Sequence, residues 1–172
     1  MGLFLNILSP AMLYEEIAGS KYFVDKTEFI SRVAERIGTS NKYLCLTRPR
    51  RFDKTVMENM LGAFFTKTGN SRRLFASLKV SKDKQIVQQM NQYNVIYIDF
   101  SRVGGDSSSY TSYIENIIAI LKNDLHKAYP QVDYRLGGAT FRMIWSASRR
   151  RQASALSLCL MKGRYFSYVV YH

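Results

Sequence analysis

The stretch "LCLTRPRRFDKTVMENML", residues 44–61, decides how the rest of the chain is interpreted. It starts within a short apolar run, 42–46, that predicts a buried strand, and it ends in apolar residues at helical spacing that predict a helix. Helical backbone angles are disfavoured at Arg48 because Pro49 follows it, so a loop is expected over residues 47–53. Strand, loop and helix in this order form the frame of a phosphate-binding loop.

The phosphate-binding loop has the form G-x-x-x-x-G-K-[ST], and only its last two positions fit here. Lys54 would contact the β- and γ-phosphates of a nucleotide, and Thr55 would bind magnesium. Backbone amides at the start of the following helix would face the anion. Both glycines are missing, with Arg48 and Asp53 in their places. By itself, "KT" before a helix is a weak signal that favours an ordinary surface lysine.

A basic block in this loop admits three interpretations. Its side chains clamp the phosphates of a nucleotide, contact a nucleic-acid backbone, or lie solvated on the surface. The spacing of the residues leaves these three alternatives open. The members of the block are Arg48, Arg50, Arg51 and Lys54.

Beyond this stretch, strands and helices alternate, which predicts an α/β fold with parallel strands and crossover helices. A second strand of buried type is predicted over 94–100, and the clearest helix over 108–128. Another helix should follow Asp25, which we expect as its N-cap with Glu28 as the capping-box partner, and should end at Gly38.

The composition describes a basic protein of about one domain, since the chain has 172 residues. Its 25 lysines and arginines against 13 acidic residues give a net charge of +12. This charge points to an anionic partner: a nucleotide, a nucleic acid or an acidic surface. Two isolated cysteines encode neither a disulfide framework nor a zinc site, which indicates a reducing compartment, the cytoplasm. No signal peptide or membrane-spanning stretch is predicted. Cys45, inside the apolar run, is expected to be a small buried hydrophobe.

Residues 131–172 form a basic tail in which regular periodicity fades. Within it, "ASALSLCLM" (153–161) and "YFSYVVY" (165–171) are candidates for strands, but the pattern does not settle the structure of the tail as a whole. We therefore divide the chain into a domain over 1–130 and this tail, which lacks the pattern of an independent fold.

Three segments in order resemble the AAA-ATPase-like family: "YFVDKT" (22–27), "LTRPRRFDKT" (46–55) and "YNVIYIDFS" (93–101). Members of that family typically have "YVDKT" followed by "RPRRFGKS" or "RPRRFGKT". The resemblance covers roughly residues 1–130 and implies the N-terminal part of a P-loop NTPase-like three-layer fold that binds ATP with magnesium. The family commonly carries a PD-(D/E)XK nuclease domain further on. The pattern of that nuclease, an acidic residue, any residue and then lysine, does not occur in this chain.

On this resemblance, Asp53 stands where the family has glycine. Glycine lets the backbone approach phosphate and adopt angles that a Cβ disfavours, whereas aspartate adds bulk and negative charge. Two like charges about 4 Å apart, at an effective dielectric of about 20, repel by about 4 kcal/mol, which lowers affinity by roughly two to three orders of magnitude. Asp53 has two alternative roles, pairing with Lys54 or capping the helix. The nucleotide contacts that the resemblance implies are Arg48, Arg50, Arg51, Phe52, Asp53, Lys54 and Thr55, with Thr55 also as a magnesium ligand.

A second departure concerns the acidic site that an ATPase of this type needs, an apolar strand that ends in Asp-Glu. The chain contains no Asp-Glu dipeptide. Asp99, which ends "VIYID", is the remaining candidate for a metal-linked carboxylate, although the resemblance places its strand earlier in the fold. Without the acidic site, water is not expected to be activated at magnesium.

The sequence therefore predicts an AAA-ATPase-like P-loop domain with degenerate ATP binding and no hydrolysis by the chain alone. The alternative is a non-enzymatic basic module that binds nucleic acid or a partner protein. A tail unlike the family is what a truncated or frame-shifted gene would produce, and that origin is a hypothesis.

Overall fold

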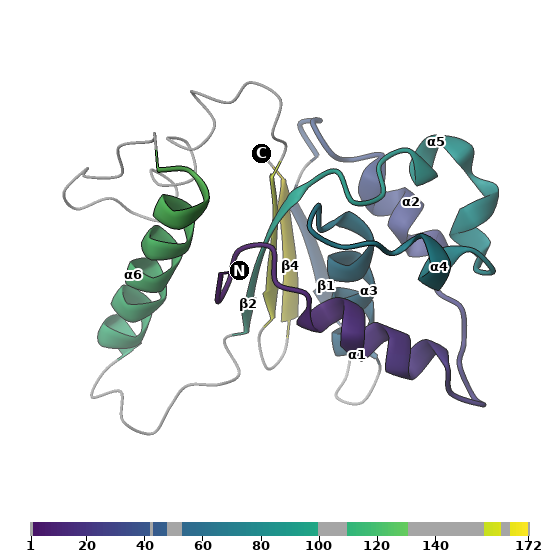
Figure 1. Ribbon diagram of the computed structural model, residues 1–172, viewed down its shortest axis with the longest axis horizontal. Coiled ribbons are helices and arrows are strands. Elements are labelled where there is room, and N and C mark those ends of the chain that lie inside the picture. The colour runs from purple at the N-terminus through teal and green to yellow at the C-terminus, as the bar shows by residue number, and fades with distance from the viewer. Residues whose placement is uncertain are drawn as a thin grey trace.

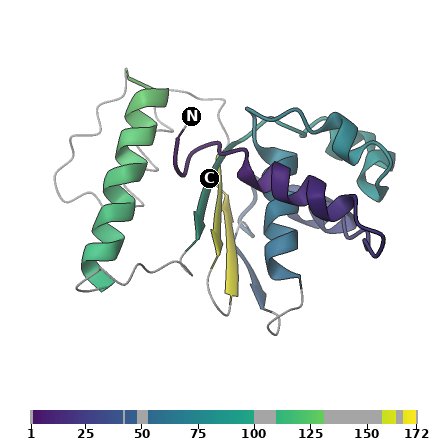
Figure 2. The ribbon, with the colours of Figure 1, turned by 60° about the horizontal axis from the view of Figure 1, so that its bottom comes forward.

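A four-stranded sheet lies between two layers of helices (Figures 1 and 2). Helices α1 to α5 lie on one side of the sheet and α6 lies on the other, so the predicted three-layer arrangement of helix, sheet and helix is present. The computed structural model describes residues 2–41, 43–47, 53–99, 110–130, 157–162 and 166–171, with the last two ranges described by their backbone alone.

Helices and strands alternate along most of the described chain, as the sequence predicts for an α/β fold. The predicted strands 42–46 and 94–100 and the predicted helix 108–128 are confirmed within two residues. The elements are α1 (Ser9–Ala18), α2 (Glu28–Ala34), β1 (Tyr43–Thr47), α3 (Lys54–Phe65), α4 (Arg72–Phe75), the 3-10 helix η1 (Lys79–Lys82), α5 (Lys84–Val87), β2 (Asn94–Asp99), α6 (Tyr110–Ala128), β3 (Ser157–Lys162) and β4 (Phe166–Tyr171).

The strands stand in the order β1-β4-β3-β2. Strand β3 pairs in parallel with β2, while β4 pairs antiparallel with both β3 and β1. Strands β1 and β2 therefore run in one direction, as predicted, and β3 runs with them, whereas β4 runs in the opposite direction. The physical reason is chain length: β4 begins at residue 166, directly after β3 ends at 162, and so short a connection allows only an antiparallel return.

Both strands predicted within the tail 131–172 are confirmed as β3 and β4. They do not lie apart from the rest of the chain, because they fill the two central positions of the sheet. The sheet thus takes its strands from both sides of residue 130. A division of the chain at that residue stays a prediction.

The larger part of the core lies between the sheet and helices α1 to α5. Aromatic rings fill its centre: Tyr14 stacks on Phe75 with ring centroids 5.5 Å apart, and Phe64 meets Phe75 edge-on at 5.2 Å. Such pairs add to the hydrophobic gain from burial. These ring contacts hold α1, α3 and α4 together on the side of the sheet where α3 follows the candidate loop.

The second part of the core lies between β2 and α6. Its buried members are Leu5, Ile96, Ile98, Ile117, Leu121 and Leu125. The N-terminal segment runs beside β2, because the Asn6 amide donates to the Val95 carbonyl at 2.7 Å and the Tyr97 amide to the Phe4 carbonyl at 2.9 Å. Strand β2 is covered on both faces, because Val95 packs into the larger core and Ile96 into this second part.

Strand β1 is not buried, contrary to the prediction. Its residues alternate between exposed and half-buried positions, and Cys45 is exposed where a buried thiol was expected. The reason is packing: β1 contacts the larger core through Leu44, whereas the core beneath α6, as far as the described residues show, includes β2 and no residue of β1.

Candidate functional site

The strand, loop and helix predicted around residues 44–61 are in place, since β1 ends at Thr47 and α3 starts at Lys54. The structure therefore describes the two ends of the candidate loop and, of its predicted contacts, Asp53, Lys54 and Thr55. The remaining predicted contacts, Arg48, Arg50, Arg51 and Phe52, lie outside the described residues together with Pro49.

Asp53 adopts a left-handed backbone, with φ 57° and ψ 23°, directly before α3. A side chain in this region costs roughly 1–2 kcal/mol relative to the right-handed conformation, and glycine is the residue that adopts it freely. Aspartate is among the few other residues that tolerate it. The backbone at position 53 thus has the shape that glycine favours, at the position where the resemblance expects glycine.

The Asp53 carboxylate forms an ion pair with the ammonium of Lys26. It makes no hydrogen bond that caps α3, so the capping role considered for this residue is wrong. Both side chains are partly solvated, at 30% exposure for Lys26 and 49% for Asp53. An ion pair as exposed as this one contributes only about 0.2–1 kcal/mol to stability.

Lys26 is presented to the loop by a turn that its two neighbours fix. Asp25 Oδ1 accepts hydrogen bonds from the Thr27 amide at 2.8 Å and the Thr27 hydroxyl at 2.7 Å. Its other oxygen accepts from the Lys79 amide at 2.7 Å, and the Val80 amide donates to the Thr27 hydroxyl at 3.0 Å. Asp25 is therefore not the N-cap of α2 as predicted, because its carboxylate closes a local turn and joins it to η1.

The same hydrogen bonds act on the charge of Asp25. Burial works against the charged form, but the hydrogen bonds from the Thr27 hydroxyl, the Thr27 amide and the Lys79 amide outweigh it, and the pKa of Asp25 lies below its ordinary value. Helix α2 begins after Thr27 and ends at Ala34, four residues before the predicted end. Gly38 lies in the turn that follows, in a left-handed conformation with φ 79°.

Thr55, the predicted magnesium ligand, lies in the first turn of α3 and lines a cavity of about 420 Å³. This cavity extends to β2 and α6, where Tyr97 and Tyr113 line it. The Tyr97 hydroxyl donates to Asn59 Oδ1 at 3.2 Å, which joins β2 to α3 near the loop. A hydroxyl and a side-chain amide thus share one hollow beside the start of the helix.

Asp99 ends β2, and its backbone pairs with Lys162 of β3. Its side chain lies outside the described part of the structure, so its role as a metal-linked carboxylate stays a prediction. Within the residues that the structure describes, no three His, Cys, Asp or Glu side chains gather as a group that could hold a metal ion. No helix in that part of the chain is both long enough and apolar enough to cross a membrane.

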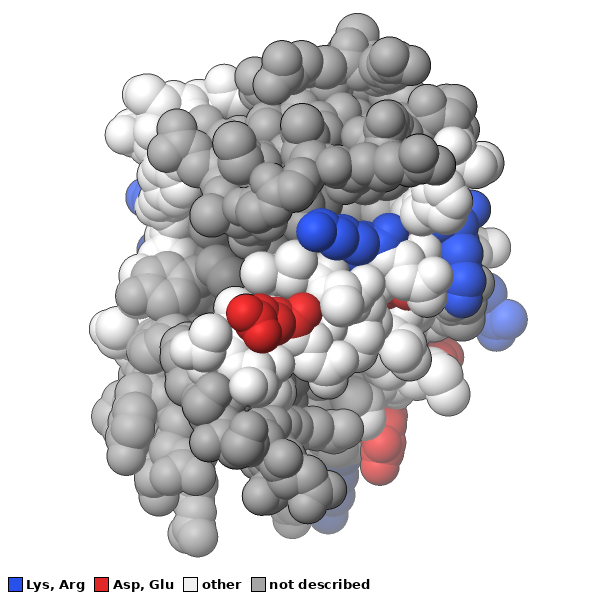
Figure 3. Space-filling model, turned by 90° about the vertical axis from the view of Figure 1, so that its left-hand side faces the viewer, with Lys and Arg blue, Asp and Glu red and all other residues white. Residues whose placement is uncertain are grey.

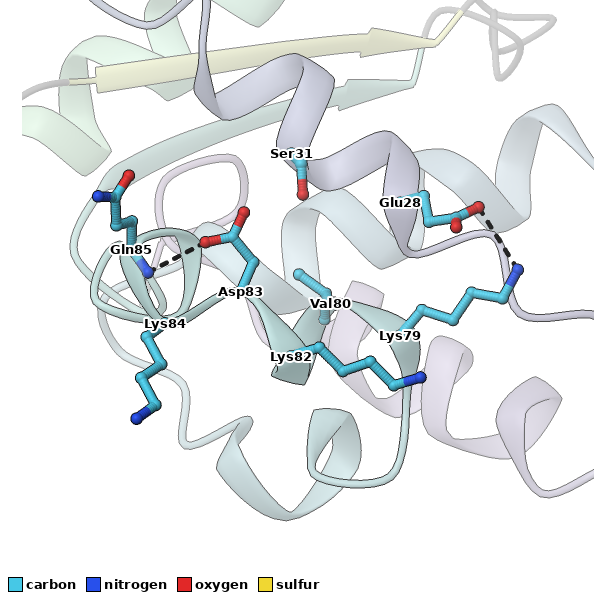
Figure 4. A pocket seen from close by; sticks show the side chains of 8 residues that line it. All are labelled: Glu28, Ser31, Lys79, Val80, Lys82, Asp83, Lys84 and Gln85. Atoms are coloured by element: carbon cyan, nitrogen blue, oxygen red, sulfur yellow. Dashed lines mark hydrogen bonds and ion pairs between the residues drawn. The ribbon is translucent and has the colours of Figure 1, made fainter.

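A second hollow is lined by residues of α2, η1 and α5, and three of its lining side chains are lysines (Figure 4). Lys79 reaches Glu28 of α2 at 3.4 Å, while Lys82 and Lys84 extend in different directions. Asp83 accepts hydrogen bonds from the first amides of α5 and is engaged in capping. On the side of the molecule that carries α6, basic and acidic side chains are also both present, in separate places (Figure 3).

Lys26 is the residue of the site that sequence analysis did not single out. The sequence feature that points to Lys26 is the segment "YFVDKT", which carries part of the family resemblance. Lys26 is the middle one of its three consecutive polar residues. The contact with Asp53 spans 27 positions of the chain, so no local pattern predicts it.

Comparison with known proteins gives one result that bears on this site. A protein-family model described as "Predicted AAA-ATPase" matches residues 12–160, which includes the loop, the turn that carries Lys26 and most of β3. No curated protein matches the chain, and no solved structure matches it.

Proposed function

The chain belongs to the predicted AAA-ATPase family, and from that premise we propose that the loop of residues 48–55 binds ATP with magnesium. The observation that carries the proposal is the left-handed backbone of Asp53 between β1 and α3. In a phosphate-binding loop, a residue with these angles lets the chain turn so that the first amides of the helix face the phosphates. The frame of the site is thus kept although the glycine is not.

The roles within the loop follow from its chemistry. Lys54 contacts the β- and γ-phosphates, and the Thr55 hydroxyl supplies one ligand to magnesium, which would neutralise phosphate charge. Thr55 is exposed and lines a hollow, which suits a ligand position. Four further residues complete the proposed contacts: Arg48, Arg50, Arg51 and Phe52.

Asp53 makes the proposed binding weak. Its carboxylate places a negative charge beside the residue that would hold the phosphates, and its Cβ hinders a close backbone approach. The ion pair with Lys26 offsets part of the charge. We therefore expect an affinity below that of a loop with glycine at this position by roughly one to three orders of magnitude.

Hydrolysis by the chain alone is not part of the proposal. It would need carboxylates that hold magnesium and orient water, and the sequence contains no Asp-Glu dipeptide. Asp99 is the remaining candidate, at the end of β2.

Isothermal titration calorimetry with Mg-ATP tests the proposal on the parent chain, Asp53→Gly and Asp53→Asn. Asp53→Gly should bind roughly 10- to 1000-fold more tightly than the parent. Asp53→Asn should recover only part of this gain, because asparagine removes the charge but keeps a Cβ. The double variant Asp53→Gly, Lys54→Ala is the control and should bind as weakly as the parent. A folded Asp53→Gly protein that binds Mg-ATP no better than the parent contradicts the proposal.

A second candidate function is supported by the basic surface around η1. Residues 72–84 carry five exposed basic side chains, and the chain as a whole has a net charge of +12. Basic side chains that extend in different directions suit successive phosphates of a nucleic-acid backbone better than one small anion. The five are Arg72, Arg73, Lys79, Lys82 and Lys84.

The two candidate functions differ in salt dependence. Binding of DNA or RNA should weaken steeply as salt rises, and Lys82→Ala and Lys84→Ala should each lower the slope by about 1. These two variants should leave Mg-ATP binding by Asp53→Gly unchanged. Nucleic-acid binding that is unaffected by both substitutions argues against this surface.

A further inference from the structure

Lys26 reaches the candidate loop from a different part of the chain. Its ammonium contacts the Asp53 carboxylate directly before α3, next to Lys54 in the sequence. Neither partner is deeply buried, with exposures of 30% and 49%. A ligand in solvent can therefore reach the same place.

The turn that carries Lys26 is already ordered. Thr27 is fully buried, and Asp25 joins the turn to the Lys79 amide. Because the residues on either side of Lys26 are tied to the protein, its side chain starts from a fixed backbone position. Binding an anion there requires ordering of the lysine side chain alone, and the cost in conformational entropy is correspondingly small.

We propose that Lys26 is a second phosphate-binding lysine of the loop, placed opposite Lys54 by the turn of residues 25–27. This rests on the proposed function of the loop. An ammonium binds carboxylate and phosphate oxygens through the same charge-assisted hydrogen bonds, so the Asp53 carboxylate stands in for a phosphate oxygen in its contact with Lys26. In the parent chain Asp53 engages this lysine, and glycine at position 53 releases it.

A purely structural role for Lys26 predicts different behaviour. An exposed ion pair contributes little to stability, so its loss would leave the fold intact and the affinity for anions unchanged. The phosphate-binding role instead predicts a loss of affinity in a chain that no longer contains Asp53. The Asp53→Gly background separates the two, because the ion pair is already absent there.

The test is calorimetric titration of Asp53→Gly and of Asp53→Gly, Lys26→Ala with Mg-ATP and with tripolyphosphate. The lysine substitution should weaken the binding of both ligands by about tenfold, the effect expected for one charge-assisted contact. Lys26→Arg in the same background keeps the charge and should bind within about threefold of Asp53→Gly. Lys21→Ala, a nearby exposed lysine, is the matched control for net charge and should change little.

Each outcome of this titration supports or overturns the assignment of Lys26. Equal affinities with and without Lys26 overturn the assignment and leave the proposed function standing. An equal loss in the Lys21→Ala control, or a loss for Mg-ATP that is absent for tripolyphosphate, also overturns it. If no Asp53→Gly protein binds either ligand, the proposed function fails, and the Lys26 assignment fails with it. Should Lys26→Ala not fold, Lys26→Gln removes the charge while keeping most of the side chain.

Discussion

Strands β1 and β2 run in the same direction within one sheet, and their sequences are similarly apolar, yet their surroundings differ. Strand β2 packs Val95 into the larger core and Ile96 into the core beneath α6. Strand β1 packs Leu44 into the larger core and leaves Cys45 exposed. The layer formed by α6 and the N-terminal segment therefore covers the β2 end of the sheet, while the β1 end has one helical layer among the described residues.

The largest loss of stability is expected from a cavity at β2. Ile98 is 1% exposed, and Ile98→Ala should cost about 2–5 kcal/mol in the free energy of unfolding. Cys45→Ala in β1 should cost less than about 0.5 kcal/mol, because the thiol is exposed. Urea unfolding followed by circular dichroism measures both, and similar costs for the two substitutions would show that the strands are equally buried.

A somewhat smaller effect should come from the contact that holds α6 to the N-terminal segment. The buried carboxylate of Asp124 accepts hydrogen bonds from the Phe4 amide at 2.7 Å and the Leu5 amide at 3.2 Å. Asp124→Ala should therefore destabilise the protein by about 1.5–3 kcal/mol. The exposed Glu115→Ala on the same helix is the control in the same unfolding assay. If both substitutions cost the same, the carboxylate does not secure the layer over β2.

A smaller loss of stability, seen only at acidic pH, should come from Asp25 in the helical layer that both strands share. The pKa of Asp25 lies below its ordinary value of 3.8, so its charged form stabilises the fold above that pH, and this contribution is lost as pH falls through the lowered pKa. Asp25→Asn lacks this titration. The difference in urea midpoint between parent and variant should therefore shrink between about pH 5 and pH 2. A difference that stays constant over this range would contradict the role given to Asp25.

The smallest effect on stability is expected for the substitutions used in thiol labelling. The labelling rate reports directly on the exposure of Cys45 in β1. In a Cys159→Ser background, Cys45 should react with a maleimide at nearly the same rate in native and urea-unfolded protein, because it is exposed. A cysteine placed at Ile98, with both natural cysteines replaced by serine, should be protected in the native state. Protection of Cys45 would mean that its face of β1 is covered after all.

Sequence patterns predicted those parts of the fold that local spacing determines. The extent of α6 and the start of α3 at Lys54 follow from helical periodicity. The predicted burial of β1 was wrong because a short apolar run does not show whether one or both faces of a strand are covered.

The candidate site shows the same limit. "KT" before a helix located Lys54 and Thr55, and the departure from glycine located Asp53. The contact with Lys26 depends on tertiary structure, and the turn at Asp25 depends on a competition between two kinds of local hydrogen bond that sequence spacing does not resolve.

The position of β4 has a consequence for how the protein folds. Among the described strands, β1 pairs with β4 alone, and Tyr43 has its partner at Val170. During synthesis β1 therefore emerges long before the strand that completes its hydrogen bonding, and such distant pairing slows folding and exposes an unpaired strand edge. A nascent chain stalled at residue 160 should be cleaved by protease near β1, and one extended past residue 171 should resist cleavage there. Equal protection in both would mean that β1 is held by its helical layer before the sheet forms.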